Sequence, residues 1–255
     1  MQNDRWTETL MRSLNRKEEA VSLEYKNAFN QLESNSKLKA LRFLRDKFVL
    51  DADLCWEQEN ISEHSALLER QMAVEKVDVK NSQIPKAALL IDQPVQTTLY
   101  YCCLYHYDSN PNDISSPLSL KNFHKLSDKQ YVLTALKTLS KQKRWLDIEK
   151  LFFNKSLFGS PKFRSCIDVE RIAEILAKSG ATPEVLSFYI RNEISNDKKF
   201  DLAKKYQCHQ IVVDCYVAAR NRIALIDYMA KNLRSGTPAY FYADSSLKNS
   251  VANFV

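Results

Sequence analysis

Apolar residues recur at steps of three and four along most of the chain, which is the spacing of one face of an α-helix. In the first half, the clearest apolar stripe consists of Leu38, Leu41, Leu44, Phe48, Ala52 and Cys55. The pattern predicts long amphipathic helices over residues 8–32, 37–57 and 62–79. Pro85 and Pro94 then bound a predicted short helix and open a longer one, because proline is tolerated in the first turn of a helix and disfavoured further inside.

Residues 109–126 interrupt the helical pattern. The segment is rich in Ser, Asn, Asp and Pro (SNPNDISSPLSLKN), which favour local turns over a packed face. It predicts a surface loop with at most one short helix.

Shorter amphipathic segments follow from residue 127. Ser127 and Gln130 have the spacing of a capping box. Gly180 is expected to end one helix, and Thr182 with Pro183 to cap and open the next. Further helices are predicted to begin near residues 145, 168, 197, 209 and 221, the last ending near residue 233. This succession is typical of stacked helical hairpins.

The predicted fold is therefore all-α, an irregular α-solenoid of stacked helical hairpins, without a strict period of the tetratricopeptide type. We expect the N-terminal longer helices at 1–108, a surface loop at 109–126, a C-terminal short-helix solenoid at 127–234, and a frayed tail at 235–255. In a solenoid each hairpin packs against its neighbours only, which leaves long surfaces for protein recognition.

Glycine usage agrees with a helical fold. The chain has three glycines in 255 residues, whereas ordinary proteins use glycine at roughly 7%. Gly159 and Gly180 fall between short amphipathic segments, where a helix ends or the backbone takes a positive φ. Glycine is thus expected to mark helix boundaries and not a phosphate-binding loop.

No targeting segment is expected. The longest charge-free stretch, residues 93–107, is too short and too polar to span a membrane. The N-terminal sequence MQNDRWTETL lacks the apolar run of a signal peptide, and Gln2 is incompatible with myristoylation. These features favour a cytoplasmic protein.

Neither a metal site nor an enzyme active site is expected. The six cysteines form no CxxC pair and are predicted to be buried thiols, and Cys208, His209 and Cys215 are too few for a structural zinc site. GxGxxG, GxxxxGK[ST], HExxH and GxSxG motifs do not occur in the sequence. The four histidines are scattered and are predicted to be hydrogen-bonded packing residues, while Asp51 and Asp53 are expected to point apart on a helix. We expect no catalysis and no cofactor.

The formal net charge of +6 is concentrated in one stretch. The basic residues there, which stand against Asp147 and Glu149, are Lys137, Lys141, Lys143, Arg144, Lys150, Lys155, Lys162 and Arg164. Such a cluster attracts an acidic protein, an anionic membrane surface or nucleic acid. A solvated helix face with a charged loop is the plain alternative. The alternative function is a helical-repeat nucleic-acid-binding protein that uses residues 137–164, although base-reading positions in each repeat are absent.

Five strings in the chain carry a family signature: FVLDADLCW (48–56), LLERQ (67–71), VEKVD (74–78), DKQYVLTAL (128–136) and QCHQIVVDCY (207–216). They resemble the spermatogenesis-defective thirty-nine family, the B-type relative of vacuolar protein sorting subunit sixteen. More distantly, RWLDIEKLF (144–152) and the loop around GSPKF look like the C-terminal domain of subunit sixteen. The resemblance covers residues 38–232. Family members usually carry an additional polar N-terminal region, so it implies a shortened chain.

The resemblance implies a non-enzymatic adaptor that binds the B-type vacuolar protein sorting subunit thirty-three, a Sec/Munc-type protein that regulates membrane fusion. It implies a role in endosomal and lysosomal vesicle trafficking, peripheral on late and recycling endosomes. Small GTPases of recycling endosomes are further implied partners, and membrane association is implied to occur through partners. No nucleic acid is expected as a partner.

The resemblance also selects partner-binding residues, on the helix with the LLERQ string and on the helix opened by the DK pair. These are Ser62, Glu63, Ala66, Arg70, Asp128, Lys129 and Gln130. Subunit sixteen has an arginine directly after the DK pair, whereas Gln130 makes no charged bidentate contact. Ordinary alternatives stay open: Arg70 as a solvent-facing residue, Asp128 and Gln130 as helix caps, and Trp145 as a core residue.

Overall fold

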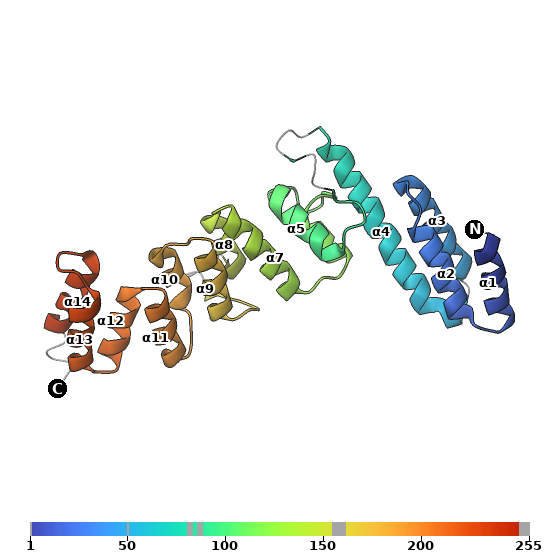
Figure 1. Cartoon of the computed structure of the whole chain (residues 1–255). Coiled ribbons are helices and arrows are strands. Elements are labelled where there is room, and N and C mark those ends of the chain that lie inside the picture. The colour runs from blue at the N-terminus through green and yellow to red at the C-terminus, as the bar shows by residue number, and fades with distance from the viewer. Residues whose placement is uncertain (1, 50, 81–83, 86–88, 155–161, 250–255) are drawn as a thin grey trace. The chain divides into compact units, whose positions relative to one another are not determined.

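The computed structural model describes residues 2–49, 51–80, 84–85, 89–154 and 162–249 (Figure 1). The chain divides into two compact units, Met1–Ser127 and Asp128–Val255. Within the described residues each unit is built from helices that pack against their sequence neighbours. The prediction of an all-α fold of stacked helical hairpins is confirmed.

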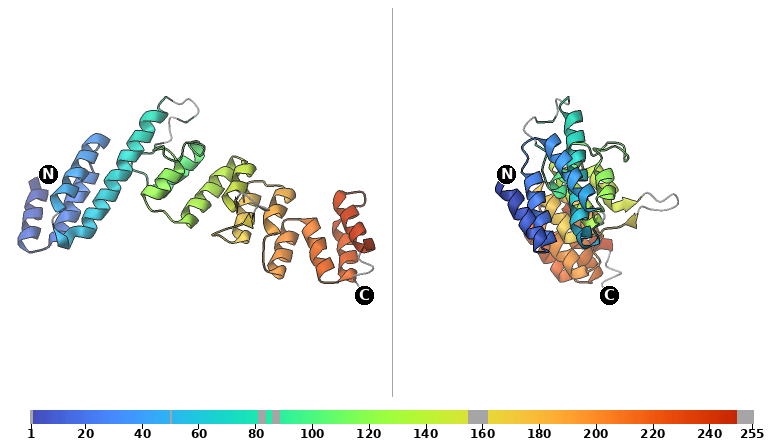
Figure 2. Two further views of the ribbon diagram at one scale, coloured as in Figure 1. Left: turned by 180° about the vertical axis from the view of Figure 1, so that it is seen from behind. Right: turned by 90° about the vertical axis from the view of Figure 1, so that its right-hand side faces the viewer.

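The N-terminal unit contains six α-helices and one 3-10 helix in its described part. They are α1 (Gln2–Ser13), α2 (Lys17–Phe29), α3 (Ser34–Phe48), η1 (Ala52–Leu54), α4 (Cys55–Asp78), α5 (Val95–Tyr105) and α6 (Pro117–Phe123). α3 and α4 lie side by side in Figures 1 and 2. The short helix α6 falls within the segment predicted to be a surface loop.

Helix boundaries in this unit differ from the sequence predictions at two polar turns. The predicted helix over 8–32 is wrong, because Asn15 takes a φ of 58° and separates α1 from α2. The helix over 37–57 is wrong as well, because the Asp51 carboxylate accepts a hydrogen bond from the Asp53 amide and opens η1. Asn and Asp suit such turns, since their short polar side chains bond locally. α4 consequently begins at Cys55, before the expected residue 62.

The main hydrophobic core of the N-terminal unit joins α2, α3, η1 and α4. Its buried members are Val21, Ala28, Leu41, Leu44, Phe48, Leu54, Ile61 and Leu68. Of the predicted apolar stripe, Leu41, Leu44 and Phe48 are buried. Ala52 and Cys55 are exposed, because α3 ends at Phe48. A long helix then follows that packs on α3.

Side chains of α4 hold residues 90–93, directly before α5. The predicted short helix between Pro85 and Pro94 is wrong for residues 84–85 and 89–94, which are not helical. Glu75 accepts hydrogen bonds from the amides of Leu90 (2.8 Å) and Ile91 (3.1 Å). Gln71 donates to the carbonyl of Gln93 (2.7 Å). These side chains satisfy backbone groups that lack a helical partner, which lets residues 90–93 pack without regular structure.

The C-terminal unit contains eight α-helices and one pair of two-residue strands in its described part. They are α7 (Asp128–Lys141), α8 (Trp145–Phe152), β1 (Phe153–Asn154), β2 (Lys162–Phe163), α9 (Val169–Lys178), α10 (Pro183–Ile190), α11 (Asn196–Lys205), α12 (His209–Ala218), α13 (Arg222–Asn232) and α14 (Pro238–Asn249). β1 pairs with β2 in antiparallel register, with Phe153 opposite Phe163. The strand pair is not among the sequence predictions, and residues 155–161, including Gly159 and Lys155, lie outside the described residues.

Polar residues in the left-handed region end several helices. Gly180 has a φ of 79° after α9, as predicted. Lys143, Gln207 and Arg220 take φ values of 57°, 56° and 52° after α7, α11 and α12. Residues with side chains therefore take the left-handed conformation at helix ends, where glycine is the common residue. This explains how so helical a chain turns with few glycines.

The prediction of a frayed tail over 235–255 is wrong for residues 238–249. They form α14, in which Ala243 is completely buried. The Tyr242 hydroxyl donates to Asp214 Oδ1 of α12 at 2.6 Å. Burial of one face and this hydrogen bond dock α14 on α12, and residues 250–255 lie outside the described residues.

Candidate partner-binding surfaces

α4 carries four of the predicted partner-binding residues within about two and a half turns. Ser62 and Ala66 are four residues apart, and Glu63 and Arg70 are seven apart, so each pair shares a helical face. Glu63 is exposed, Ser62 and Ala66 are half-buried, and Arg70 is buried. The four positions are therefore adjacent on α4 but differ in their access to solvent.

Arg70 is covered by its own chain. Its Nη1 donates to the carbonyl of Ile114 (2.6 Å) and to Oγ of Ser119 (3.3 Å), and the guanidinium lies 5.4 Å from the ring centroid of Phe123. Burial lowers the pKa of Arg70. The interpretation of Arg70 as a solvent-facing residue is wrong, because α6 and the segment before it cover this turn of α4. Its guanidinium holds that segment in place.

Glu63 lies at the edge of the covered region. Its side chain is 48% exposed, and Nδ1 of His124 donates to its Oε2 at 3.2 Å. The α4 face is thus closed by α6 around Arg70 and open beyond Glu63, toward the start of the helix.

Trp56 belongs to this open part of α4 and is not among the residues selected from the sequence. It is 70% exposed and lies seven residues before Glu63, which places both on one face. Its sequence neighbours Glu57, Gln58, Glu59 and Asn60 are polar, and they are the signal for an exposed tryptophan. Tryptophan is enriched among the residues that dominate protein interfaces. Trp56 and Glu63 are thus two exposed residues on one face near the start of α4, which we call the α4 open face.

The first turn of α7 carries the other predicted residues. Asp128, Lys129 and Gln130 are all exposed, and α7 begins at Asp128, directly after Ser127. Asp128 places a carboxylate in the first turn, where it interacts favourably with the helix dipole. α7 belongs to the C-terminal unit, whereas the α4 open face belongs to the N-terminal unit.

The predicted basic cluster is partly neutralised. Arg144 and Lys150 both pair with Asp147, at 2.6 Å and 2.8 Å. Hydrogen bonds from Lys150 and Arg144 lower the pKa of Asp147. Besides the two residues that pair with Asp147, the exposed members of the cluster in the described part of the chain are Lys137, Lys141, Lys143, Lys162 and Arg164. Trp145, interpreted as a core residue, is half-buried, and the buried residues of α8 are Ile148 and Phe152.

All four histidines are hydrogen-bonded, as predicted. His64 bonds the Tyr25 hydroxyl (2.8 Å), His106 donates to Asp78 (2.9 Å), and His209 bonds the Tyr228 hydroxyl (2.7 Å). His124 is the partner of Glu63. In the described part of the chain, no three His, Cys, Asp or Glu side chains are grouped so that they would hold a metal ion.

Two other predictions about polar side chains are corrected. Asp51 and Asp53 converge on Nζ of Lys17, at 3.1 Å and 3.0 Å. They are not on an α-helix, because Asp51 caps the 3-10 helix η1 and Asp53 lies within it. Cys102, Cys103 and Cys208 are buried as expected, and burial raises the pKa of Cys102 to about 12. Cys55 and Cys166 are exposed, contrary to the prediction.

The fold defines the chain as an all-α protein of stacked helical hairpins, and among the described residues no helix is long and apolar enough to cross a bilayer. No protein-family model matches the chain. It is 32% identical over 246 residues to the Spermatogenesis-defective protein 39 homolog of Danio rerio, covering 94% of this chain and 50% of the relative.

Two further relatives carry the same name. Identity is 34% over 231 residues with the Mus musculus homolog, covering 87% of this chain and 46% of the relative. The Spermatogenesis-defective protein 39 of Caenorhabditis elegans is 27% identical over 202 residues, covering 71% of this chain and 38% of the relative. The chain spans about half the length of the first two relatives. The predicted similarity to proteins of this name is confirmed over most of the chain, and the relation to subunit sixteen stays a prediction.

Proposed function

We propose that the chain belongs to the spermatogenesis-defective thirty-nine family and acts as a non-enzymatic adaptor for a Sec/Munc-type protein, the B-type vacuolar protein sorting subunit thirty-three. The observation that carries the proposal is the similarity over most of the chain to relatives of this name. In this role the chain acts in endosomal and lysosomal trafficking and promotes membrane fusion through its partner.

The exposed surfaces support a binding role. Stacked helical hairpins leave long side surfaces for another protein. The α4 open face offers a large aromatic side chain next to a carboxylate, and the first turn of α7 offers charged and amide groups. An exposed tryptophan with a polar surround has the composition of an interface hot spot.

Location and further partners follow from the same role. We expect a peripheral position on late and recycling endosomes, reached through protein partners. Small GTPases of recycling endosomes are the expected second class of partner. The exposed basic residues of α7 add long-range attraction to an acidic protein or an anionic membrane surface.

Capture from cell extract tests the proposal. The tagged chain is expected to enrich the Sec/Munc-type protein above all other companions, as measured by quantitative mass spectrometry. Lys129→Glu is expected to reduce that enrichment. Lys198→Glu is the matched control, because Lys198 is also an exposed lysine in the first turn of a helix, α11. If the Sec/Munc-type protein is absent from the captured material, the proposed function is wrong.

A further inference from the structure

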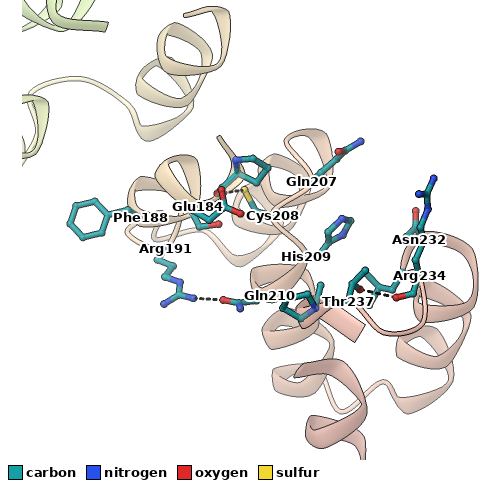
Figure 3. A pocket seen from close by; sticks show the side chains of 15 residues that line it. Glu184, Phe188, Arg191, Gln207, Cys208, His209, Gln210, Asn232, Arg234 and Thr237 are labelled. Carbon is teal, nitrogen blue, oxygen red and sulfur yellow. Dashed lines mark hydrogen bonds between the residues drawn. The ribbon is translucent and has the colours of Figure 1, made fainter. Parts of the chain in front are cut away.

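A groove in the C-terminal unit lies apart from the residues predicted to bind a partner. Its volume is about 610 Å³, which is within the range of pockets that hold ligands. Three segments line it: α10, the turn between α11 and α12 at residues 207–210, and the connection from α13 to α14 at residues 232–239. Figure 3 shows these segments converging around His209.

Two arginines give the groove its charge. Figure 3 shows Arg191 and Arg234 on opposite sides of the His209 ring, and both are exposed. Arg191 Nη2 donates to Oε1 of Gln210 at 3.3 Å, which ties its guanidinium to the turn at residues 207–210. Glu184 is the acidic residue of the lining, so the two guanidinium groups leave an excess positive charge. His209 bonds Tyr228, and burial lowers the pKa of His209, so its imidazole is neutral at pH 7.

The rest of the lining suits an extended chain. Phe188 is 41% exposed at one end of the groove, and the prolines that open α10 and α14 add apolar surface. Gln207, Gln210 and Asn232 supply amide groups. Oε1 of Gln210 accepts from Arg191 and Nδ2 of Asn232 donates to the Tyr228 carbonyl, which leaves the Gln210 amide NH2 to donate to peptide backbone and the Asn232 amide oxygen to accept from it. Backbone recognition by amides together with apolar contacts is a mixed lining typical of specific pockets.

The separation of the arginines decides the kind of ligand. A single carboxylate or phosphate is bound best when guanidinium groups converge on it in a bidentate geometry. Here the guanidinium groups lie on opposite sides of His209, so one small anion does not engage both. An elongated ligand with two separated acidic groups does.

We propose that this groove binds an extended acidic peptide segment of a partner protein, with carboxylates paired to Arg191 and Arg234 and the intervening backbone on the amide side chains. The inference goes beyond the proposed function, because it assigns a second surface in the C-terminal unit. It does not depend on the identity of the Sec/Munc-type partner.

Fluorescence anisotropy of labelled peptides tests this inference on the whole chain. The probes are extended peptides with two glutamates separated by two to five residues, and matched peptides with lysines in their place. Glutamate peptides are expected to bind and lysine peptides are not. Arg191→Glu and Arg234→Glu are each expected to weaken binding about tenfold or more, because a charge-assisted pair becomes a repulsive one.

The control is Arg222→Glu, since Arg222 is exposed at the start of α13 and is not part of the lining. It changes the net charge equally and is expected to leave affinity within about twofold. Unchanged thermal unfolding of all three variants shows that the fold is intact, since each of these arginines is exposed. The inference is overturned if no glutamate peptide binds, if the control loses as much affinity, or if inorganic phosphate displaces the peptide at micromolar concentration. Because no Sec/Munc-type protein is present, these outcomes are independent of the capture experiment.

Discussion

The guanidinium of Arg70 on α4 donates a 2.6 Å hydrogen bond to the backbone carbonyl of Ile114, 44 residues further along the chain. This bond, with those to Ser119 and the contact with Phe123, attaches the segment before α6 to the long helix α4. A residue selected for partner binding thus has a structural partner inside its own unit. The α4 surface available to another protein is shifted toward Trp56 and Glu63.

Replacing Arg70 is expected to destabilise the N-terminal unit. Arg70→Ala leaves the Ile114 carbonyl and the Ser119 hydroxyl without this donor, and the loss of buried bonds to a charged group costs about 2–3 kcal/mol in free energy of unfolding. Urea unfolding followed by circular dichroism measures it. Lys76→Ala on the exposed side of the same helix is the control, with an expected change within about 0.5 kcal/mol. Equal stability of the two variants would show that the Arg70 contacts are unimportant.

Replacing Gly180 by alanine is expected to lower the stability of the fold only through the backbone conformation that Gly180 adopts. Its φ is 79°, and a Cβ at this position would meet no atom within 4 Å. Gly180→Ala should therefore cost about 1 kcal/mol, the price of the left-handed conformation, with no steric clash. Gly180→Asn should lose less, because asparagine tolerates this region. Thermal unfolding compares the two, and a larger loss for asparagine would contradict this explanation.

Packing of α14 is expected to contribute to the stability of the C-terminal unit. Ala243→Glu places a carboxylate at a completely buried position and should cost at least about 2 kcal/mol. Ser245→Glu introduces the same charge at an exposed position of the same helix and serves as the control. Hydrogen exchange of residues 238–249 reports the effect locally. If these amides already exchange freely in the unmodified chain, α14 is not docked.

Acid is expected to destabilise the fold through His64 and His209. Burial lowers the pKa of both imidazoles below the usual value. The unfolded chain then binds protons that the folded chain does not, so stability is fully present above about pH 6.5 and falls as the pH drops below it. Unfolding in urea between pH 7.5 and 5.5 measures the slope. The double variant His64→Gln, His209→Gln should show a shallower slope, and an unchanged slope would assign the effect to other groups.

Trp56 is expected to carry a large share of the affinity for the Sec/Munc-type partner. Trp56→Ala removes a side chain that is 70% exposed in the free chain, so the fold should be unaffected. A hot-spot tryptophan contributes at least about 2 kcal/mol, which corresponds to roughly a 30-fold weaker complex. Titration calorimetry measures the affinity. The control is Trp6→Ala, which changes another exposed tryptophan of the same unit. If both variants lose the same affinity for the partner, Trp56 has no specific role in binding.

Local signals in the sequence predicted the helices of the C-terminal unit well. Gly180 ends α9, Pro183 opens α10, and the helices expected near residues 197, 209 and 221 begin within one residue of those positions. These boundaries are set by backbone preferences of single residues, which the sequence carries directly. The sequence analysis does not predict the turn at Asn15, where a φ of 58° separates α1 from α2.

Long-range contacts account for what the sequence did not predict. The environment of Arg70 depends on Ile114 and Ser119, and that of α14 on Asp214 of α12. Neither pairing has a local signature, because the partners are 28 or more residues apart. The polar residues that follow Trp56 in the sequence are a local signal that predicts its exposure. The groove between Arg191 and Arg234 has no such signal, since three separate segments build it.

The most direct measurement is the mass of the complex in solution, by gel filtration with light scattering. The purified chain and the B-type vacuolar protein sorting subunit thirty-three, mixed at micromolar concentration, are expected to elute together with the mass of one copy of each. Separate elution at the masses of the two free proteins would contradict the adaptor function.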